Sequence, residues 1–126
     1  MTYTSIEQSK ALMRLGLDEK TADLTIIPNS AIPYTHIKEW KRGSKEYPCW
    51  SAEVLLEILP SEVYIEEEDD MAYLKIVKED CTYTVSYYSK ERLDNVLFLC
   101  YIDATGENLA SVLFKIVEWL LTNKLI

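Results

Sequence analysis

Cys49 and His36 are the two residues that could support nucleophilic catalysis. Cys49 lies just before a segment, residues 50–60, whose pattern predicts a helix, and a thiolate is favoured near a helix N-terminus. A cysteine nucleophile usually needs a histidine as its base, and His36 is the only histidine in the chain. The alternative is that Cys49 is a small buried apolar side chain beside Trp50. This alternative needs no second residue, so we expect Cys49 to be structural and the protein not to be an enzyme.

A run of five carboxylates is the second group that could do chemistry. It could bind calcium, but it lacks both the alternating ligand spacing and the glycine that turn a calcium loop around its ion. A solvated loop between two strands explains the run without a ligand. A third interpretation is an acidic patch that meets a basic partner. The candidate patch consists of Glu66, Glu67, Glu68, Asp69 and Asp70.

A small basic cluster precedes the predicted helix at 50–60. It comprises Lys38, Lys41, Arg42 and Lys45 around Trp40, and it could hold an anion. Two nearby glutamates dilute its charge, so a solvated loop is the simpler interpretation. The whole chain carries a net charge of −8, and residues 61–126 hold 13 acidic against 6 basic side chains. Such a chain repels phosphate backbones, so we expect no direct nucleic-acid binding.

Aromatic residues supply the candidate protein interface. Nine tyrosines are present, and Tyr83, Tyr87 and Tyr88 fall in or next to a predicted strand. Trp119 flanks the apolar stripe of the predicted C-terminal helix. Tyrosine and tryptophan give large contact areas at low entropic cost and are enriched at interfaces. These four residues therefore form the candidate contact surface, for a protein partner or a second copy of the chain; ordinary packing is the alternative.

Length and motif content narrow the class of protein. The 126 residues suit a single domain, 1–126. Three widely spaced cysteines without a CxxC pair argue against disulfides and zinc. Neither a signal-peptide pattern nor an apolar run of about 18 residues is present, so we expect a cytoplasmic protein with no membrane contact. Phosphate-binding glycine loops are also missing from the sequence, and we expect no cofactor.

Two helices are predicted in the first half of the chain. Ser5 and Gln8 form a capping-box pattern before a short amphipathic segment, and Gly16 marks its end. Residues 50–60 begin with Ser51 as a helix cap and end at Pro60, which prevents continuation. Apolar residues surround the second segment almost completely, so it is expected to be buried.

The second half predicts a sheet followed by a long helix. Segments 72–77 and 82–87 alternate, and "KEDC" between them predicts a hairpin turn. Segment 96–102 is continuously apolar, as a central strand would be, and 63–65 could add an edge strand. A helix of about 17 residues follows, capped by Thr105 or Asp103, with its apolar stripe directed at the sheet. The stripe comprises Leu109, Val112, Leu113, Ile116, Val117, Leu120 and Leu121.

The predicted fold class is therefore α+β: an antiparallel sheet of three to five strands packed by a long C-terminal helix and a short buried helix, with the N-terminal helix peripheral. Three stretches, "IEQSKALMRLGLDEKTAD", "YPCWSAEVLLEILP" and "VEWLLTNKLI", resemble a group of small uncharacterised proteins of gut anaerobic bacteria, their prophages and mobile elements. The resemblance implies a single-domain cytoplasmic protein in a phage or mobile-element setting. It transfers no functional residues.

Three functions follow from these features. The first is a small non-enzymatic protein-binding or accessory protein, possessing a protein partner and able to form a homodimer. The second is an acidic decoy that imitates nucleic acid and binds a DNA-binding protein. The third is a cysteine-dependent enzyme using Cys49 and His36, which the residue types support least.

Overall fold

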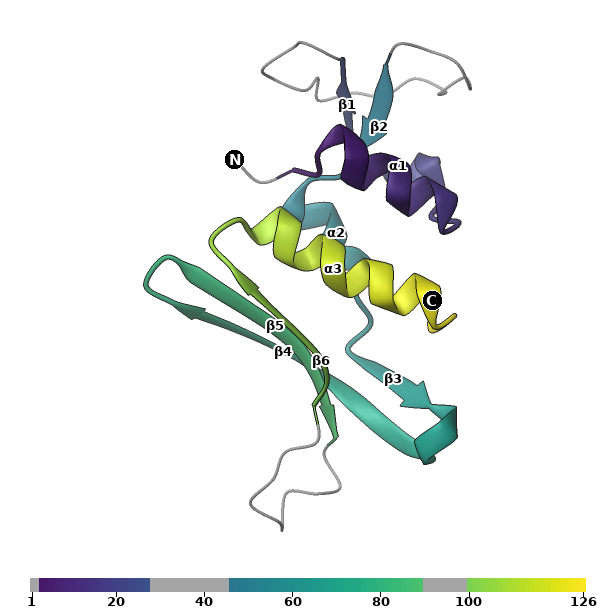
Figure 1. The fold of residues 1–126 in the computed structure, drawn as a ribbon, viewed down its shortest axis with the longest axis vertical. Helices are drawn as coiled ribbons and strands as arrows, with labels where there is room; N and C mark the ends of the chain where they lie inside the picture. The colour runs from purple at the N-terminus through teal and green to yellow at the C-terminus, as the bar shows by residue number, and fades with distance from the viewer. Residues whose placement is uncertain (1–2, 28–45, 90–99) are drawn as a thin grey trace.

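The computed structural model describes residues 3–27, 46–89 and 100–126, and within them it has an α+β fold (Figure 1). The helices are α1 (Ile6–Arg14), α2 (Ala52–Ile58) and α3 (Leu109–Thr122), with short 3-10 turns η1 (Glu19–Thr21) and η2 (Glu66–Glu68). The strands are β1 (Leu24–Ile26), β2 (Tyr47–Cys49), β3 (Glu62–Ile65), β4 (Asp70–Glu79), β5 (Thr82–Ser89) and β6 (Cys100–Gly106).

The main sheet is an antiparallel meander in the order β3-β4-β5-β6. Glu79 pairs with Thr82, so Asp80 and Cys81 form the two-residue turn that "KEDC" predicts. The predicted edge strand at 63–65 is confirmed as β3. A second, two-stranded sheet joins β1 to β2. Pro48 fits in β2 because an edge position does not require every N–H to pair.

The prediction of a central strand at 96–102 is wrong for the part of the segment that the structure describes. Residues 96–99 lie outside the described residues, and the strand runs from Cys100 to Gly106. It is an edge strand and not a central one, because only β5 pairs with it among the described strands. Its residues are mostly half-buried or exposed, with Ala104 alone buried. Within the described residues, β6 therefore has one face covered by α3 and is not covered on both faces.

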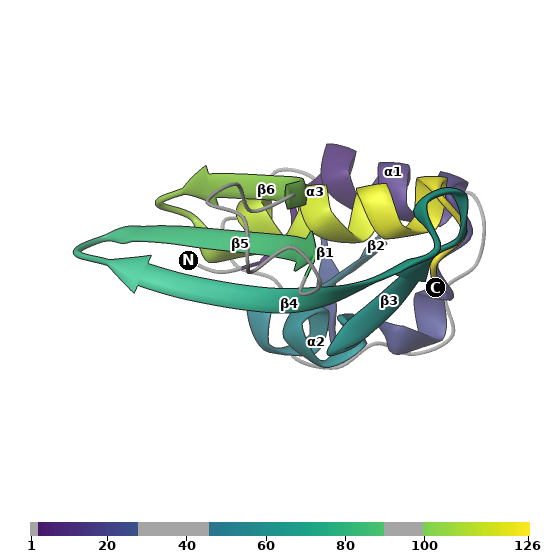
Figure 2. The same ribbon diagram turned by 90° about the horizontal axis from the view of Figure 1, so that it is seen from below.

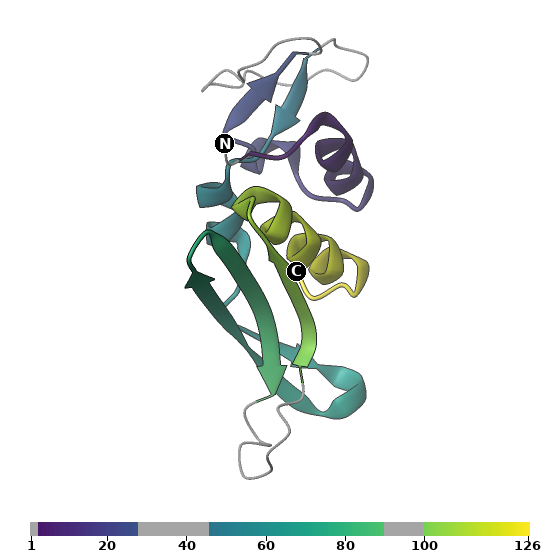
Figure 3. The same cartoon turned by 60° about the vertical axis from the view of Figure 1, so that its left-hand side comes forward.

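Helix α3 lies at the centre of the molecule. It packs against β5 and β6 on one side and against α1 and α2 on the other (Figures 1 and 3). Its buried positions repeat at helical spacing and include Leu113, Ile116 and Leu120, none of which is exposed. The described part of the chain contains no helix long and apolar enough to cross a membrane.

Helix α1 sits on the far side of α3 from the main sheet, which confirms its peripheral place (Figure 3). The predicted capping box is present: the Gln8 backbone N–H donates to Ser5 Oγ at 3.1 Å, and the Ser5 N–H donates to Gln8 Oε1 at 2.9 Å. Gly16 follows the helix with φ +101°, a conformation that glycine adopts without strain.

The stretch around Cys49 is structural. Trp50 is fully buried, and its indole N–H donates to Thr21 Oγ1 at 2.9 Å. Thr4, in the N-terminal segment, makes two hydrogen bonds to the Trp50 backbone. The Thr4 N–H donates to the Trp50 carbonyl at 2.9 Å, and Thr4 Oγ1 accepts from the Trp50 N–H at 3.0 Å. Ser51 then caps α2 by accepting from the Val54 N–H at 3.3 Å, as predicted.

The ends of α3 differ in part from the prediction. Neither Thr105 nor Asp103 caps the helix, because β6 continues through both; Asn108 Oδ1 accepts from the Ser111 N–H at 3.2 Å instead. At the other end the Leu125 N–H donates to the Leu120 carbonyl at 2.8 Å, and Lys124 has φ +56°. This is a Schellman ending, which folds the last residues back along the helix.

The β4–β5 hairpin extends beyond the helices (Figure 2). Val85 and Ala72, near the helices, are buried, whereas Ile76 is 45% exposed. Because Val85 pairs with Ile76, residues on this face differ in burial between β5, against which α3 packs, and the part of β4 that lies beyond the helix. The positions of the helices therefore determine which of the predicted interface tyrosines are exposed to solvent.

Candidate functional site

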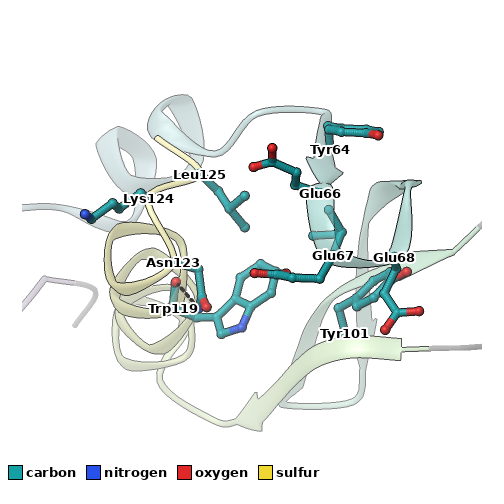
Figure 4. Close-up of a pocket in the computed structure, with 10 residues that line it drawn as sticks. Tyr64, Glu66, Glu67, Glu68, Tyr101, Trp119, Asn123, Lys124 and Leu125 are labelled. Atoms are coloured by element: carbon teal, nitrogen blue, oxygen red, sulfur yellow. Dashed lines mark hydrogen bonds between the residues drawn. The ribbon is translucent and has the colours of Figure 1, made fainter.

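A pocket of about 540 Å³ opens where the η2 turn approaches the C-terminal end of α3 (Figure 4). Its walls come from three separate parts of the chain. Glu66–Glu68 and Tyr64 form one wall, Tyr101 at the start of β6 forms another, and Trp119 with the Schellman ending of α3 forms the third. Two predicted features, the acidic run and Trp119, therefore meet in one hollow.

The acidic wall is set by the tight connection between β3 and β4. Ile65 pairs with Asp70, so four residues close the loop. Asp69 ends η2 with φ +46° and ψ +51°, a left-handed conformation that aspartate tolerates better than most residues. Its carboxylate accepts a hydrogen bond from the Tyr64 hydroxyl, and this hydrogen bond is the main reason that the pKa of Tyr64 is raised. Glu66–Glu68 remain exposed around the turn.

Asp70 does not belong to the exposed acidic patch, which corrects the prediction. It is only 7% exposed, because it begins β4 on the face that also buries Ala72. The Tyr101 hydroxyl donates to its Oδ2 at 2.6 Å. A register irregularity between Tyr87 and Tyr88 on β5 accompanies this start of β6. Asp70 therefore fixes the position of the Tyr101 ring in the pocket wall.

Tyr87 is a core residue, so its assignment to an interface is wrong. It is fully buried on the helix-facing side of β5, and burial raises its pKa well above the ordinary tyrosine value. Its hydroxyl donates to the Pro60 carbonyl at 2.6 Å. Its ring stacks on Trp119, with centroids 5.9 Å apart and planes at 28°. The Trp119 ring is thus positioned by stacking on Tyr87, and Trp119 also lines the pocket.

The other two predicted tyrosines lie elsewhere. Tyr88 is half-buried on the outer face of the sheet, where its ring lies 6.4 Å from that of Tyr73. Tyr83 lies near the hairpin tip, with Lys78 Nζ 5.5 Å from its ring centroid. Tyr83, Tyr88 and Trp119 therefore occupy three different regions and do not form one contact surface.

Cys49 has the properties of a buried structural thiol. It is fully buried, and burial raises its pKa to about 12 despite an opposing hydrogen bond with Thr4. His36 and the basic cluster at residues 38–45 lie outside the described residues. Among the residues that are described, no group of three or more His, Cys, Asp or Glu side chains could hold a metal ion.

We expect the three thiols to react with a disulfide reagent at neutral pH in a fixed order. Cys81 is exposed and should react first. Cys100 is exposed as a residue, but partial desolvation of its thiol and the nearby Asp103 raise its pKa, so it should follow. Cys49 should react only after unfolding, because its thiol is both inaccessible and protonated. Time-resolved labelling with mass spectrometry measures the order; native labelling of Cys49 as fast as Cys81 would revive the cysteine-enzyme hypothesis.

Sequence reasoning missed Tyr64, Tyr101 and Lys124 as pocket residues. For Tyr64 a signal existed: it alternates with the buried Val63 and Ile65, which places its ring on the opposite face of β3. For Tyr101 and Lys124 no local signal existed. Tyr101 depends on a hydrogen bond to a residue 31 positions away, and Lys124 depends on the Schellman ending.

Comparison with protein-family models, with curated proteins and with solved structures finds no match to this chain.

Proposed function

We propose that the protein is a non-enzymatic binding module that engages a basic protein partner through the pocket at the end of α3. The observation that carries the proposal is the meeting of the Glu66–Glu68 turn with Trp119 and Tyr101 in one hollow. Carboxylates steer and orient a positively charged partner, and buried aromatic rings supply contact area at low entropic cost. The resemblance to phage and mobile-element proteins is consistent with such an accessory role.

The distribution of acidic residues favours a local basic contact over imitation of a nucleic acid. Exposed carboxylates are spread over several elements of the described chain: the Glu66–Glu68 turn, helix α2, strand β3, the β4–β5 turn and strand β6 with the residue after it. Besides the turn, they include Glu53, Glu57, Glu62, Glu79, Asp80, Asp103 and Glu107. A decoy would present a continuous row of charge to a DNA-binding surface, whereas only the Glu66–Glu68 turn adjoins the aromatic pocket. The decoy remains the second hypothesis, and it predicts a partner that duplex DNA displaces.

The test is affinity capture from host-cell lysate with a matched pair of variants. In the first variant, Glu66–Glu68 are all changed to glutamine, which removes three charges at the pocket. In the control, the exposed Glu53, Glu57 and Glu79 are changed to glutamine, which removes three charges elsewhere. We expect wild type and control to retain the same basic protein at low salt, with retention falling as salt rises. We expect the pocket variant to lose it.

Equal retention by the two variants would contradict the proposal. Displacement of the captured protein by duplex DNA would favour the decoy hypothesis. If wild type retains the partner but both variants lose it, the overall charge of the protein and not the pocket determines binding.

A homodimer through the outer sheet face is a separate proposal. Tyr88 and Tyr73 form a cross-strand aromatic pair there, and the adjoining Met71 and Val77 are half-buried. Sedimentation over a wide concentration range measures it. A dimer that Tyr88→Ser weakens supports this interface, and a monomer at all concentrations rejects it.

A further inference from the structure

We infer that the pocket at the end of α3 binds the side chain of a single arginine, an inference that rests on the proposed function and names the group it recognises. The pocket joins two kinds of wall that together suit a guanidinium: aromatic faces and exposed carboxylates. A guanidinium is planar, stacks on aromatic rings and carries donors that match carboxylate geometry. A lysine ammonium is a compact and strongly hydrated charge that gains less from stacking.

The aromatic walls are held in place before any ligand arrives. Trp119 stacks on Tyr87, whose hydroxyl is in turn fixed by the Pro60 carbonyl. Tyr101 is fixed by its hydrogen bond to the buried Asp70. Ordering these rings is therefore completed on folding, which lowers the entropic cost of binding at the pocket.

The carboxylates are available to a ligand. In Figure 4 the side chains of Glu66 and Glu67 extend from the turn toward the end of α3, whereas Glu68 points away from it. Asp69 is engaged by Tyr64, so it serves the turn and not the pocket. Within the described ranges, no lysine or arginine forms an ion pair with Glu66 or Glu67. Two carboxylates of one turn therefore line the pocket, and neither has a lysine or arginine partner among the described residues.

Lys124 is expected to weaken the binding of a cation at this site. It lines the pocket, but in Figure 4 its ammonium extends away from Glu66 and Glu67, so its positive charge opposes a cationic ligand only from a distance. It also occupies the left-handed position of the Schellman ending, φ +56°, where glycine is the preferred residue. Changing Lys124 to glycine therefore removes the opposing charge and relieves the backbone at the same time. The variant should bind cations more tightly without loss of fold.

The experiment titrates the full chain with blocked tripeptides of the form Gly-X-Gly, in which X is arginine, lysine or citrulline. Citrulline keeps the planar shape of arginine but carries no charge. The readout is the indole N–H resonance of Trp119 in an NMR spectrum, assigned with Trp119→Phe. We expect saturable, millimolar binding of the arginine peptide, weaker binding of lysine and none of citrulline. Glu67→Gln should weaken the arginine peptide about fivefold, as for one exposed charge contact, and Lys124→Gly should strengthen it by a smaller factor, because its charge lies farther from the ligand.

Several results would overturn the inference: an unmoved Trp119 resonance with the arginine peptide, equal binding of arginine and citrulline, or a Lys124→Gly variant that is folded but binds no better. These failures are distinct from failure of the proposed function. If the captured partner depends on Glu66–Glu68 but the arginine peptide leaves Trp119 unmoved, the binding-module proposal stands and the arginine pocket is rejected. If the arginine peptide binds but no captured partner depends on Glu66–Glu68, the arginine pocket stands and the binding-module proposal is rejected.

Discussion

Replacing Trp50 by alanine is expected to lower the free energy of unfolding by about 3–5 kcal/mol, the range seen when a large buried aromatic side chain is removed. Trp50 is fully buried, and its indole N–H donates to Thr21 at 2.9 Å. Its backbone N–H and carbonyl both form hydrogen bonds with Thr4, so the surrounding chain is fixed and cannot easily close the cavity. Chemical denaturation followed by circular dichroism measures the change.

Trp50→Phe is the matched control. It keeps an aromatic ring but loses the hydrogen bond, so it should cost about 1–3 kcal/mol, less than the alanine variant. Thr21→Val leaves the indole N–H without its acceptor and also removes the hydrogen bond that the Thr21 hydroxyl donates to the Asp18 carbonyl, so its cost is an upper bound for the indole hydrogen bond. If Trp50→Ala costs no more than Trp50→Phe, the ring does not pack as the structure indicates, and the interpretation of this stretch as structural is wrong.

The features that sequence alone could predict are the ones that local chemistry decides. The capping box at Ser5, the Ser51 cap, and the stop at Pro60 each need residues only a few positions apart, and each is present. The Asp80–Cys81 turn belongs to the same class. The apolar stripe of α3 is equally local, because a helical repeat of that length has one dominant face.

The faces of the strands could be predicted only in part. Alternation places Tyr87 and Tyr88 on opposite sides of β5, as observed. It does not say which side the helices cover, because that depends on where α3 crosses the sheet. The candidate interface therefore mixed the buried Tyr87 with the half-buried Tyr88. In the same way, Asp70 could not be separated from the acidic run without the register of β3 on β4.

The pocket was beyond sequence reasoning because its walls meet through tertiary contacts alone. Trp119 was identified as a candidate contact residue beside the apolar stripe and Glu66–Glu68 as part of an acidic loop, but nothing in their spacing brings them together. They meet because α3 crosses the sheet from the β6 end and terminates beside the β3–β4 turn (Figure 1). The path of one helix therefore determines the composition of the site.

We expect Tyr87→Ala to have the other large effect, because it damages both the core and the pocket. Loss of the fully buried ring should lower the free energy of unfolding by about 3–5 kcal/mol. Trp119 would also lose the ring on which it stacks, at 5.9 Å, and with it the support that fixes the aromatic wall. Binding of the arginine peptide should therefore weaken, even under conditions in which the variant remains folded.

Tyr87→Phe separates these two consequences. It keeps the ring and its stacking on Trp119 but leaves the Pro60 carbonyl without its donor, at a cost of about 1–2 kcal/mol. Its peptide binding should match that of wild type, since the wall is preserved. Denaturation curves and peptide titrations on the same samples compare the three proteins. If Tyr87→Phe weakens binding as much as Tyr87→Ala does, the ring is not what positions Trp119, and the hydroxyl contact with the end of α2 shapes the pocket instead.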